Sequence, residues 1–193
     1  MCRTGKETAM KVLIVVDMQK DFIDGSLGTR EAQTIVPNVA AKIAAYPPEA
    51  VFATRDTHAP DYLTSCEGRH LPVVHCVAGT PGHALHSQIA EALAAVAPDH
   101  ILDKPTFGSM ELAQQLRALA GSEPLEIELV GLCTGICVLS NAILLKAAFP
   151  EAEISVDAAC CACVTPQSHD TALAAMKLCQ IAIENEGREP WRG

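Results

Sequence analysis

An unbroken apolar run near the amino terminus places the strongest constraint on the fold. The segment Lys11–Asp17 (KVLIVVD) is rich in branched apolar residues at consecutive positions and ends in an acid. Such a strand suits a parallel sheet that is buried on both faces. Further strands are predicted at Ala50–Asp56, His100–Lys104, Pro124–Leu132, Ala152–Ala159 and Gln180–Glu184.

Segments with helical spacing of apolar residues separate these strands. The predicted helices are Thr34–Tyr46, His86–Ala97, Ser109–Gly121, Gly135–Ala148 and Thr165–Cys179. Regular alternation of strands and helices predicts an α/β fold, a three-layer α/β/α sandwich with a mostly parallel central sheet. We expect one domain at residues 11–193 after a loose N-terminal leader at residues 1–10, because neither a repeat nor a linker interrupts the pattern.

Charge and cysteine content argue against several classes of protein. The formal net charge of −9 leaves no basic surplus for nucleic acid. No apolar run reaches the length of a membrane span, and residues 1–11 lack the apolar core of a signal peptide. Nine cysteines, several of them in apolar segments, are typical of a reduced cytoplasmic protein. We therefore expect a cytoplasmic protein without nucleic-acid or membrane partners. The sequence is compatible with a homo-oligomer and does not decide the oligomeric state.

Three reactive side chains lie where strands are predicted to end. Asp17 ends the first strand, Lys104 ends a later one, and Cys137 lies at a strand-to-helix turn. The carboxyl ends of parallel strands border the ligand crevice, so these residues are expected to meet there. A helix N-terminus lowers the pKa of a thiol and can hold an oxyanion, which suits a cysteine nucleophile with Asp17 as base. Each residue alone also has an ordinary explanation, as a core cysteine, a capping acid or a surface lysine.

The long polar segment Arg55–Cys76 combines histidines with acids. Asp56 and His58 alternate as on an extended chain, so their side chains can share one side, and Glu67 and His75 follow. Two imidazoles and two carboxylates suit zinc, iron or manganese better than calcium. The alternative is a polar surface loop with incidental histidines.

The motifs VVDMQKDF, RDTH, HCVAGTPG, DKPTFGS, GLCTGICV and VTPQSHDTAL occur in this order between Lys11 and Glu184. In this order and spacing the chain resembles the nicotinamidases of the isochorismatase-like cysteine hydrolases. One departure is Gly135, where the family usually has an acid or an amide two residues before the nucleophile.

The resemblance implies a role for each matching residue. The catalytic triad is expected to be Asp17, Lys104 and Cys137, with backbone N–H groups of Cys133 and Cys137 as the oxyanion hole and a non-proline cis peptide bond at Leu132–Cys133. One divalent metal ion, most readily Zn, with Fe or Mn as alternatives, is expected on Asp56, His58, Glu67 and His75. Phe22 and Phe107 are expected to pack around the substrate ring.

The resemblance further implies hydrolysis of nicotinamide to nicotinate and ammonia through a cysteine thioester, in NAD salvage. An alternative is a cysteine hydrolase of the same superfamily that acts on another small amide or on a carbamoyl or ureido compound. A rival from a different class, given nine cysteines, is a non-catalytic metal-binding or redox-sensing protein.

Overall fold

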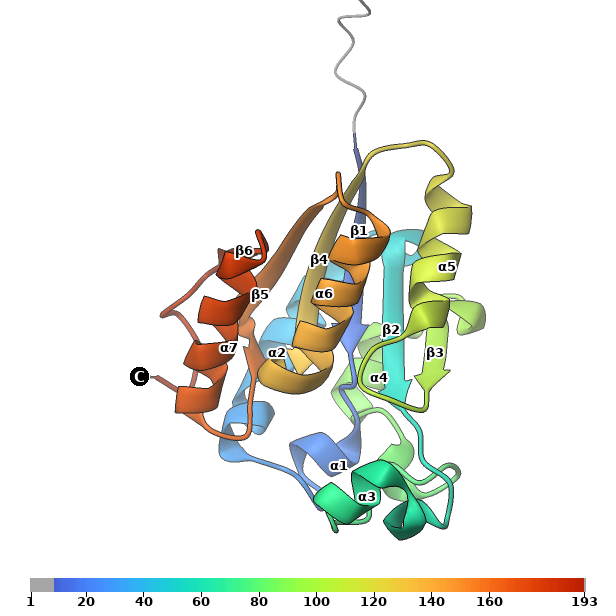
Figure 1. Cartoon of the computed structure of the whole chain (residues 1–193), viewed down its shortest axis with the longest axis vertical. Helices are drawn as coiled ribbons and strands as arrows, with labels where there is room; N and C mark the ends of the chain where they lie inside the picture. Colours follow the sequence, from blue (N-terminus) through green and yellow to red (C-terminus); the bar gives the residue numbers. More distant parts are fainter. Residues whose placement is uncertain (1–8, 193) are drawn as a thin grey trace, which may run out of the picture.

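Six parallel strands form one central sheet in the computed structural model, which describes residues 9–192 (Figure 1). They are β1 (Met10–Val16), β2 (Val51–Asp56), β3 (Ile101–Lys104), β4 (Leu125–Leu132), β5 (Glu153–Ala162) and β6 (Ala182–Glu184). Their order is β3-β2-β1-β4-β5-β6, and every neighbouring pair is parallel. The order reverses between β1 and β4, which is the place where ligands bind in open parallel sheets.

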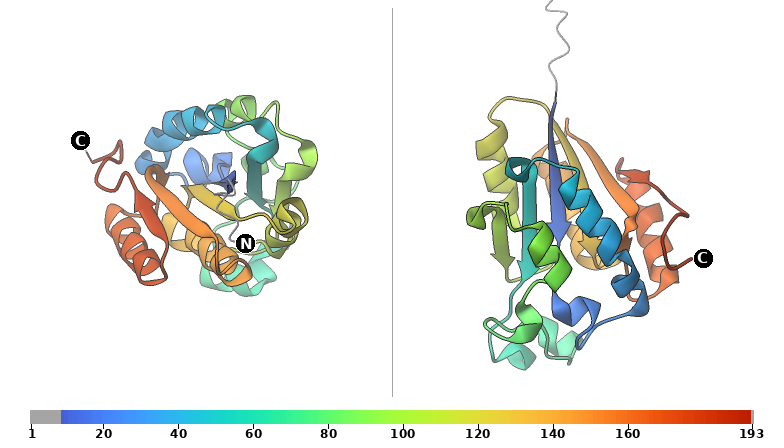
Figure 2. Two further views of the ribbon diagram at one scale, coloured as in Figure 1. Left: turned by 90° about the horizontal axis from the view of Figure 1, so that it is seen from above. Right: turned by 180° about the vertical axis from the view of Figure 1, so that it is seen from behind.

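Helices cover both faces of the sheet, which confirms the three-layer prediction. Helices α5 (Met110–Ala120), α6 (Leu139–Ala148) and α7 (Pro166–Leu178) lie on one face, whereas α2 (Arg30–Ala44) and α4 (Ser87–Ala92) lie on the other (Figures 1 and 2). Val12, Ile14 and Val16 of β1 pack into the first core, while Leu13 and Val15 pack into the second. All five are fully buried, which explains why this strand is apolar at consecutive positions.

Short helices lie in the segments for which the sequence predicts neither a helix nor a strand. Helices α1 (Lys20–Ile23) and α3 (Cys66–His70) lie beyond the carboxyl ends of the strands (Figure 1). The 3₁₀ helices are η1 (Pro48–Ala50), η2 (Tyr62–Thr64), η3 (Pro81–His83) and η4 (Pro98–His100). Their few residues carry too little hydrophobic periodicity to be predicted from the sequence.

Several element boundaries differ from the predictions. Helix α2 begins at Arg30 because the side chain of Thr29 accepts a hydrogen bond from the backbone of Ala32 and caps the helix. Helix α4 ends at Ala92, five residues before the predicted end. Strand β1 begins at Met10, one residue before the predicted start at Lys11, and residues 1–8 of the expected leader lie outside the described part of the chain.

The predicted helix Gly135–Ala148 is divided into two parts. Residues Thr134–Val138 form a single π-helical turn, η5, and the α-helix begins only at Leu139. Isolated π-turns occur frequently at functional sites. The nucleophile candidate Cys137 therefore lies in a widened turn and not in a regular helix.

Gly131 permits the close approach of β1 and β4 near the carboxyl ends of the two strands. Its φ is +116°, and a Cβ placed there would lie 2.1 Å from the carbonyl oxygen of Val16. We expect Gly131→Ala to lower the free energy of unfolding by about 3 kcal/mol or more, measured by urea denaturation, because backbone atoms have to move. Gly79→Ala is the matched control: its φ is +78° but its Cβ would meet nothing, so a loss of about 1–2 kcal/mol is expected. Equal losses would contradict the steric argument.

Candidate active site

Lys104 joins the two other residues of the expected triad. Its Nζ lies 2.6 Å from Asp17 Oδ2 and 3.5 Å from Cys137 Sγ. Exposed fractions are 0% for Asp17, 1% for Lys104 and 4% for Cys137. Thr54 donates a hydrogen bond of 2.7 Å to Asp17 Oδ1. Apart from the ion pair with Lys104, Asp17 Oδ2 has no hydrogen-bond partner among residues 9–192, so it is free to accept a proton.

Burial and neighbouring charges shift the pKa values of both Cys137 and Asp17. Burial raises the pKa of the Cys137 thiol well above its usual value, and the Asp17 carboxylate raises it further against the effect of Lys104. Burial also raises the pKa of Asp17, although the Lys104 ammonium opposes this. The thiol therefore rests in its protonated form, and the raised pKa makes Asp17 a stronger base than an exposed carboxylate.

The backbone around Cys137 contains the expected cis peptide bond and a pair of hydrogen bonds that close the turn. The peptide bond Leu132–Cys133 is cis. The carbonyl of Cys133 accepts hydrogen bonds from the N–H groups of Ile136 (3.0 Å) and Val138 (3.2 Å), which lie on either side of Cys137 in the sequence. These bonds hold the turn that carries the sulfur, so the nucleophile candidate has a fixed backbone.

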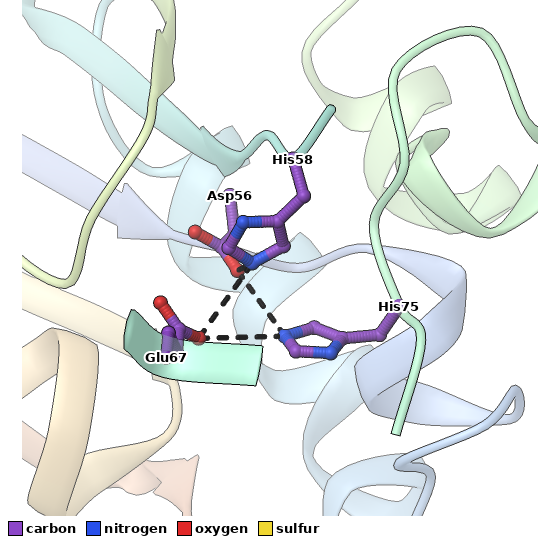
Figure 3. A group of neighbouring side chains, drawn as sticks. All are labelled: Asp56, His58, Glu67 and His75. Carbon is purple, nitrogen blue, oxygen red and sulfur yellow. Dashed lines mark ion pairs between the residues drawn. The ribbon is translucent and has the colours of Figure 1, made fainter. Parts of the chain in front are cut away.

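Four side chains from the second strand and the segment after it, Asp56, His58, Glu67 and His75, point toward one another (Figure 3). His58 Nε2 lies 2.9 Å from Asp56 Oδ2 and 3.6 Å from Glu67 Oε1. His75 Nε2 lies 3.5 Å from Asp56 Oδ2 and 3.8 Å from Glu67 Oε1. Strand β2 supplies Asp56, and helix α3 supplies Glu67.

These distances suit a metal ion at the centre of the four side chains. Ligands bonded at about 2.0–2.2 Å in a tetrahedral site lie about 3.3–3.6 Å apart. His58 Nε2 is buried without a hydrogen-bond partner among the described residues, which is expected of a nitrogen whose lone pair serves a metal. The Nδ1 of His75 lies 2.7 Å from the carbonyl oxygen of Val73, so Nδ1 carries the proton and leaves Nε2 free to ligate.

Asp56 connects the possible metal site with the triad. Its Oδ2 faces the two histidines, while its Oδ1 lies 3.4 Å from Lys104 Nζ. Burial raises the pKa of Asp56, but the neighbouring side chains of His58 and His75 and the charge of Lys104 outweigh it and hold the pKa below its usual value. Asp56 is therefore ionised, as a metal ligand has to be.

One cavity of about 220 Å³ opens between these two groups of residues. Its lining contains residues from both groups together with apolar walls: Phe22, Leu27, Thr29, Ala32, Asp56, Glu67, Leu71, His75, Phe107, Leu132, Cys133, Ile136, Cys137, Cys163 and Val164. Drug-sized ligands need about 300–1,000 Å³, so this cavity suits a smaller molecule. Both predicted aromatic residues line it: Phe22 is 9% exposed and Phe107 is 41% exposed.

Two buried amides hold the site together and were missed in the sequence. Gln19 accepts from the N–H of Asp56 (2.7 Å) and donates to its carbonyl (2.8 Å). Asn141 donates to the carbonyl of Cys137 (2.8 Å) and accepts from the N–H of Ser109 (2.9 Å). Gln19 stands two residues after Asp17, and Asn141 stands one helical turn after Cys137. In the sequence, these spacings are the only signals that could have identified Gln19 and Asn141.

Residues 11–186 match the model of the isochorismatase domain. The chain belongs to the isochorismatase-domain family. No curated protein matches it. This isochorismatase-family chain is 27% identical to the zinc-bound pyrazinamidase of Pyrococcus horikoshii, with 90% of this chain and 98% of that chain covered and a TM-score of 0.73.

Two nicotinamidases share the isochorismatase-family fold at lower identity. The enzyme of Bacillus subtilis is 23% identical, with 91% of this chain and 99% of that chain covered and a TM-score of 0.75. The yeast enzyme is 19% identical, with 92% and 100% covered and a TM-score of 0.74. As a member of this family the chain is a hydrolase with a small-molecule substrate. None of the helices in residues 9–192 has the length and hydropathy to cross a membrane.

Proposed function

We propose that this hydrolase converts nicotinamide and water to nicotinate and ammonia, in NAD salvage in the cytoplasm. The cavity carries the proposal, because the thiol of Cys137 and three of the four side chains of the possible metal site, Asp56, Glu67 and His75, line one space of about 220 Å³. A compact ring with a carboxamide on one side and a basic nitrogen on the other suits such a space. The pyrazinamidase at 27% identity supports the same class of substrate.

The residues of the triad supply the chemistry in our proposal. Asp17 takes the proton of Cys137, Lys104 holds the two charged groups together, and the sulfur attacks the amide carbon. The backbone N–H groups of Cys133 and Cys137 stabilise the oxyanion, a contribution worth about 3–4 kcal/mol per donor in other enzymes. Asp17 then protonates the nitrogen, which leaves as ammonia. Water, deprotonated by Asp17, releases nicotinate from the thioester.

The remaining residues bind and orient the substrate in this proposal. Asp56, His58, Glu67 and His75 would hold one divalent ion, with zinc the best fit, which when bound supplies a ligand position for the ring nitrogen. Phe22 and Phe107 would enclose the ring. Apolar walls exclude bulk water, which strengthens the interactions of the charged groups.

Ammonia release from three amides tests the proposal. Nicotinamide is the expected substrate, and benzamide is the matched control because it has the same shape but no ring nitrogen. We expect kcat/KM for nicotinamide to exceed that for benzamide by 100-fold or more, since only nicotinamide can use the ring-nitrogen contact. Ammonia from an N-carbamoyl amino acid but not from nicotinamide would overturn the proposal in favour of the carbamoyl alternative.

A further inference from the structure

A buried chain of hydrogen bonds leads from the nucleophile turn to the C-terminal segment. Thr134 Oγ1 lies 2.8 Å from His169 Nδ1, and His169 Nε2 lies 3.3 Å from Glu189 Oε1. The exposed fractions are 0%, 0% and 2% for Thr134, His169 and Glu189. Thr134 belongs to the π-turn η5, His169 to helix α7, and Glu189 to the segment after β6. None of the three lines the cavity, so the proposed chemistry does not account for them.

The direction of these hydrogen bonds follows from the chemistry of the groups. Burial raises the pKa of the Glu189 carboxyl, but hydrogen bonds from Arg192 and from backbone N–H groups outweigh it and keep the pKa below its usual value. Ionised Glu189 can only accept, so His169 Nε2 carries the proton and donates it. His169 Nδ1 is then an acceptor, and the hydroxyl of Thr134 donates to it. The hydroxyl rotor of Thr134 is thereby fixed.

The C-terminal segment completes this network of hydrogen bonds and leaves no ligand position in it for a metal ion. Arg192 pairs with both Glu189 and Asp170. The ring of Trp191 meets that of His169 edge-on at 5.2 Å, and the Arg192 guanidinium lies 4.5 Å from the Trp191 ring centroid. His169, Asp170 and Glu189 resemble a ligand set, but both nitrogens of His169 are engaged and Arg192 neutralises the two acids. The cluster is therefore a structural network.

Gly135 packs closely against helix α7, and its neighbour Thr134 makes the polar contact with that helix. A Cβ at position 135 would lie 3.3 Å from Ala172 Cβ of helix α7 and 3.3 Å from Cys163 Sγ, so the turn packs closely against that helix. The turn has no side chain of its own at position 135 with which to make a hydrogen bond. Thr134, its neighbour, makes the polar contact with α7 instead. The same residue follows Cys133 and lies three residues before Cys137.

We propose that Thr134, His169 and Glu189 form a positioning relay through which the C-terminal segment holds the nucleophile turn in its reactive geometry. The three are positioning residues, because they act through the backbone of Cys133 and Cys137 and do not reach the substrate. This inference rests on the proposed function only in the choice of nicotinamide as the assay substrate. Weakening the relay is expected to slow the chemical step and to leave substrate binding largely unchanged, since the cavity walls remain.

Variants at both ends of the relay test it. Thr134→Val keeps the shape but removes the hydroxyl, whereas Thr134→Ser restores a donor. We expect Thr134→Val and Glu189→Gln to lower kcat for nicotinamide at least 10-fold with KM within 2-fold of wild type, and Thr134→Ser to keep kcat within 3-fold. Circular dichroism and a thermal melt establish that each variant is folded.

Alkylation of Cys137 by iodoacetamide, followed by mass spectrometry of its peptide, gives a second measurement that needs no substrate. We expect the alkylation rate of this one cysteine to change at least 5-fold in Thr134→Val and to stay near wild type in Thr134→Ser. The proposal is overturned if Thr134→Val matches wild type in Cys137 alkylation, or if Ser and Val variants behave alike. A wild-type protein that releases no ammonia from nicotinamide would instead refute the proposed function, and the alkylation rates would still decide the relay.

Discussion

Cys137→Ala is expected to abolish ammonia release from nicotinamide, with a loss in kcat of about 10⁴-fold or more. The reason is that the sulfur of Cys137 lines the cavity and lies 3.5 Å from the Lys104 ammonium, which can stabilise the thiolate. Without the sulfur, Asp17 has no thiol to deprotonate and no thioester can form. Steady-state assays of ammonia release measure the loss.

The control for this variant is Cys179→Ala, which removes an exposed thiol that does not line the cavity and is expected to keep wild-type turnover. Both variants should bind one metal ion per chain and melt within a few degrees of wild type, because the exchange of a small buried thiol for a methyl group leaves the packing largely intact. Retention of substantial activity by Cys137→Ala would show that the mechanism is wrong, whatever the substrate.

His58→Ala is expected to remove bound metal, from one ion per chain to nearly none by elemental analysis after dialysis. His58 Nε2 is a buried nitrogen without a hydrogen-bond partner among residues 9–192, and its distances to Asp56 and Glu67 suit a shared ion. Loss of the ion should raise the KM for nicotinamide about 10-fold or more, because the ring nitrogen loses its anchor. His58 is preferred to Asp56 for this test because Asp56 also contacts Lys104.

His70→Ala provides the matched control, since His70 belongs to the same segment but is exposed and contacts the carbonyl of Cys66. It should retain the metal. A chelator should lower the melting temperature of wild type and of His70→Ala but not that of His58→Ala, because a ligand that binds only the native state stabilises it. Full metal content in His58→Ala would refute the site without reference to any activity.

The sequence was sufficient to predict where the chemistry should gather. Apolar runs that end in Asp17 and Lys104 predicted strands, and parallel strands bring their carboxyl ends to one edge. The order of β3, β2, β1 and β4 in the sheet places these ends beside one another, which is why Lys104 lies 2.6 Å from Asp17 and 3.5 Å from Cys137 although the three residues are far apart in the chain. The roles assigned to the triad and the metal residues stay predictions until the variants are measured.

The long segment after β2 could not be resolved from the sequence. Its helix α3 has only five residues, and its position depends on contacts such as the hydrogen bond from the Tyr62 hydroxyl to the carbonyl of Leu71. The distances from Glu67 to His58 and His75 follow from that packing. No local pattern encodes them, because short helices are stabilised mainly by their tertiary surroundings.

The sequence by itself determined the layered α/β architecture and the residues at the strand ends, because burial on both faces of a sheet dictates consecutive apolar residues and chain alternation dictates parallel pairing. Only the tertiary structure decided that Asp56 faces both the histidines and Lys104, that the nucleophile lies in a π-turn, and that Thr134 meets His169 and Glu189. These contacts join side chains far apart in the chain, and their distances depend on how whole helices pack against the sheet.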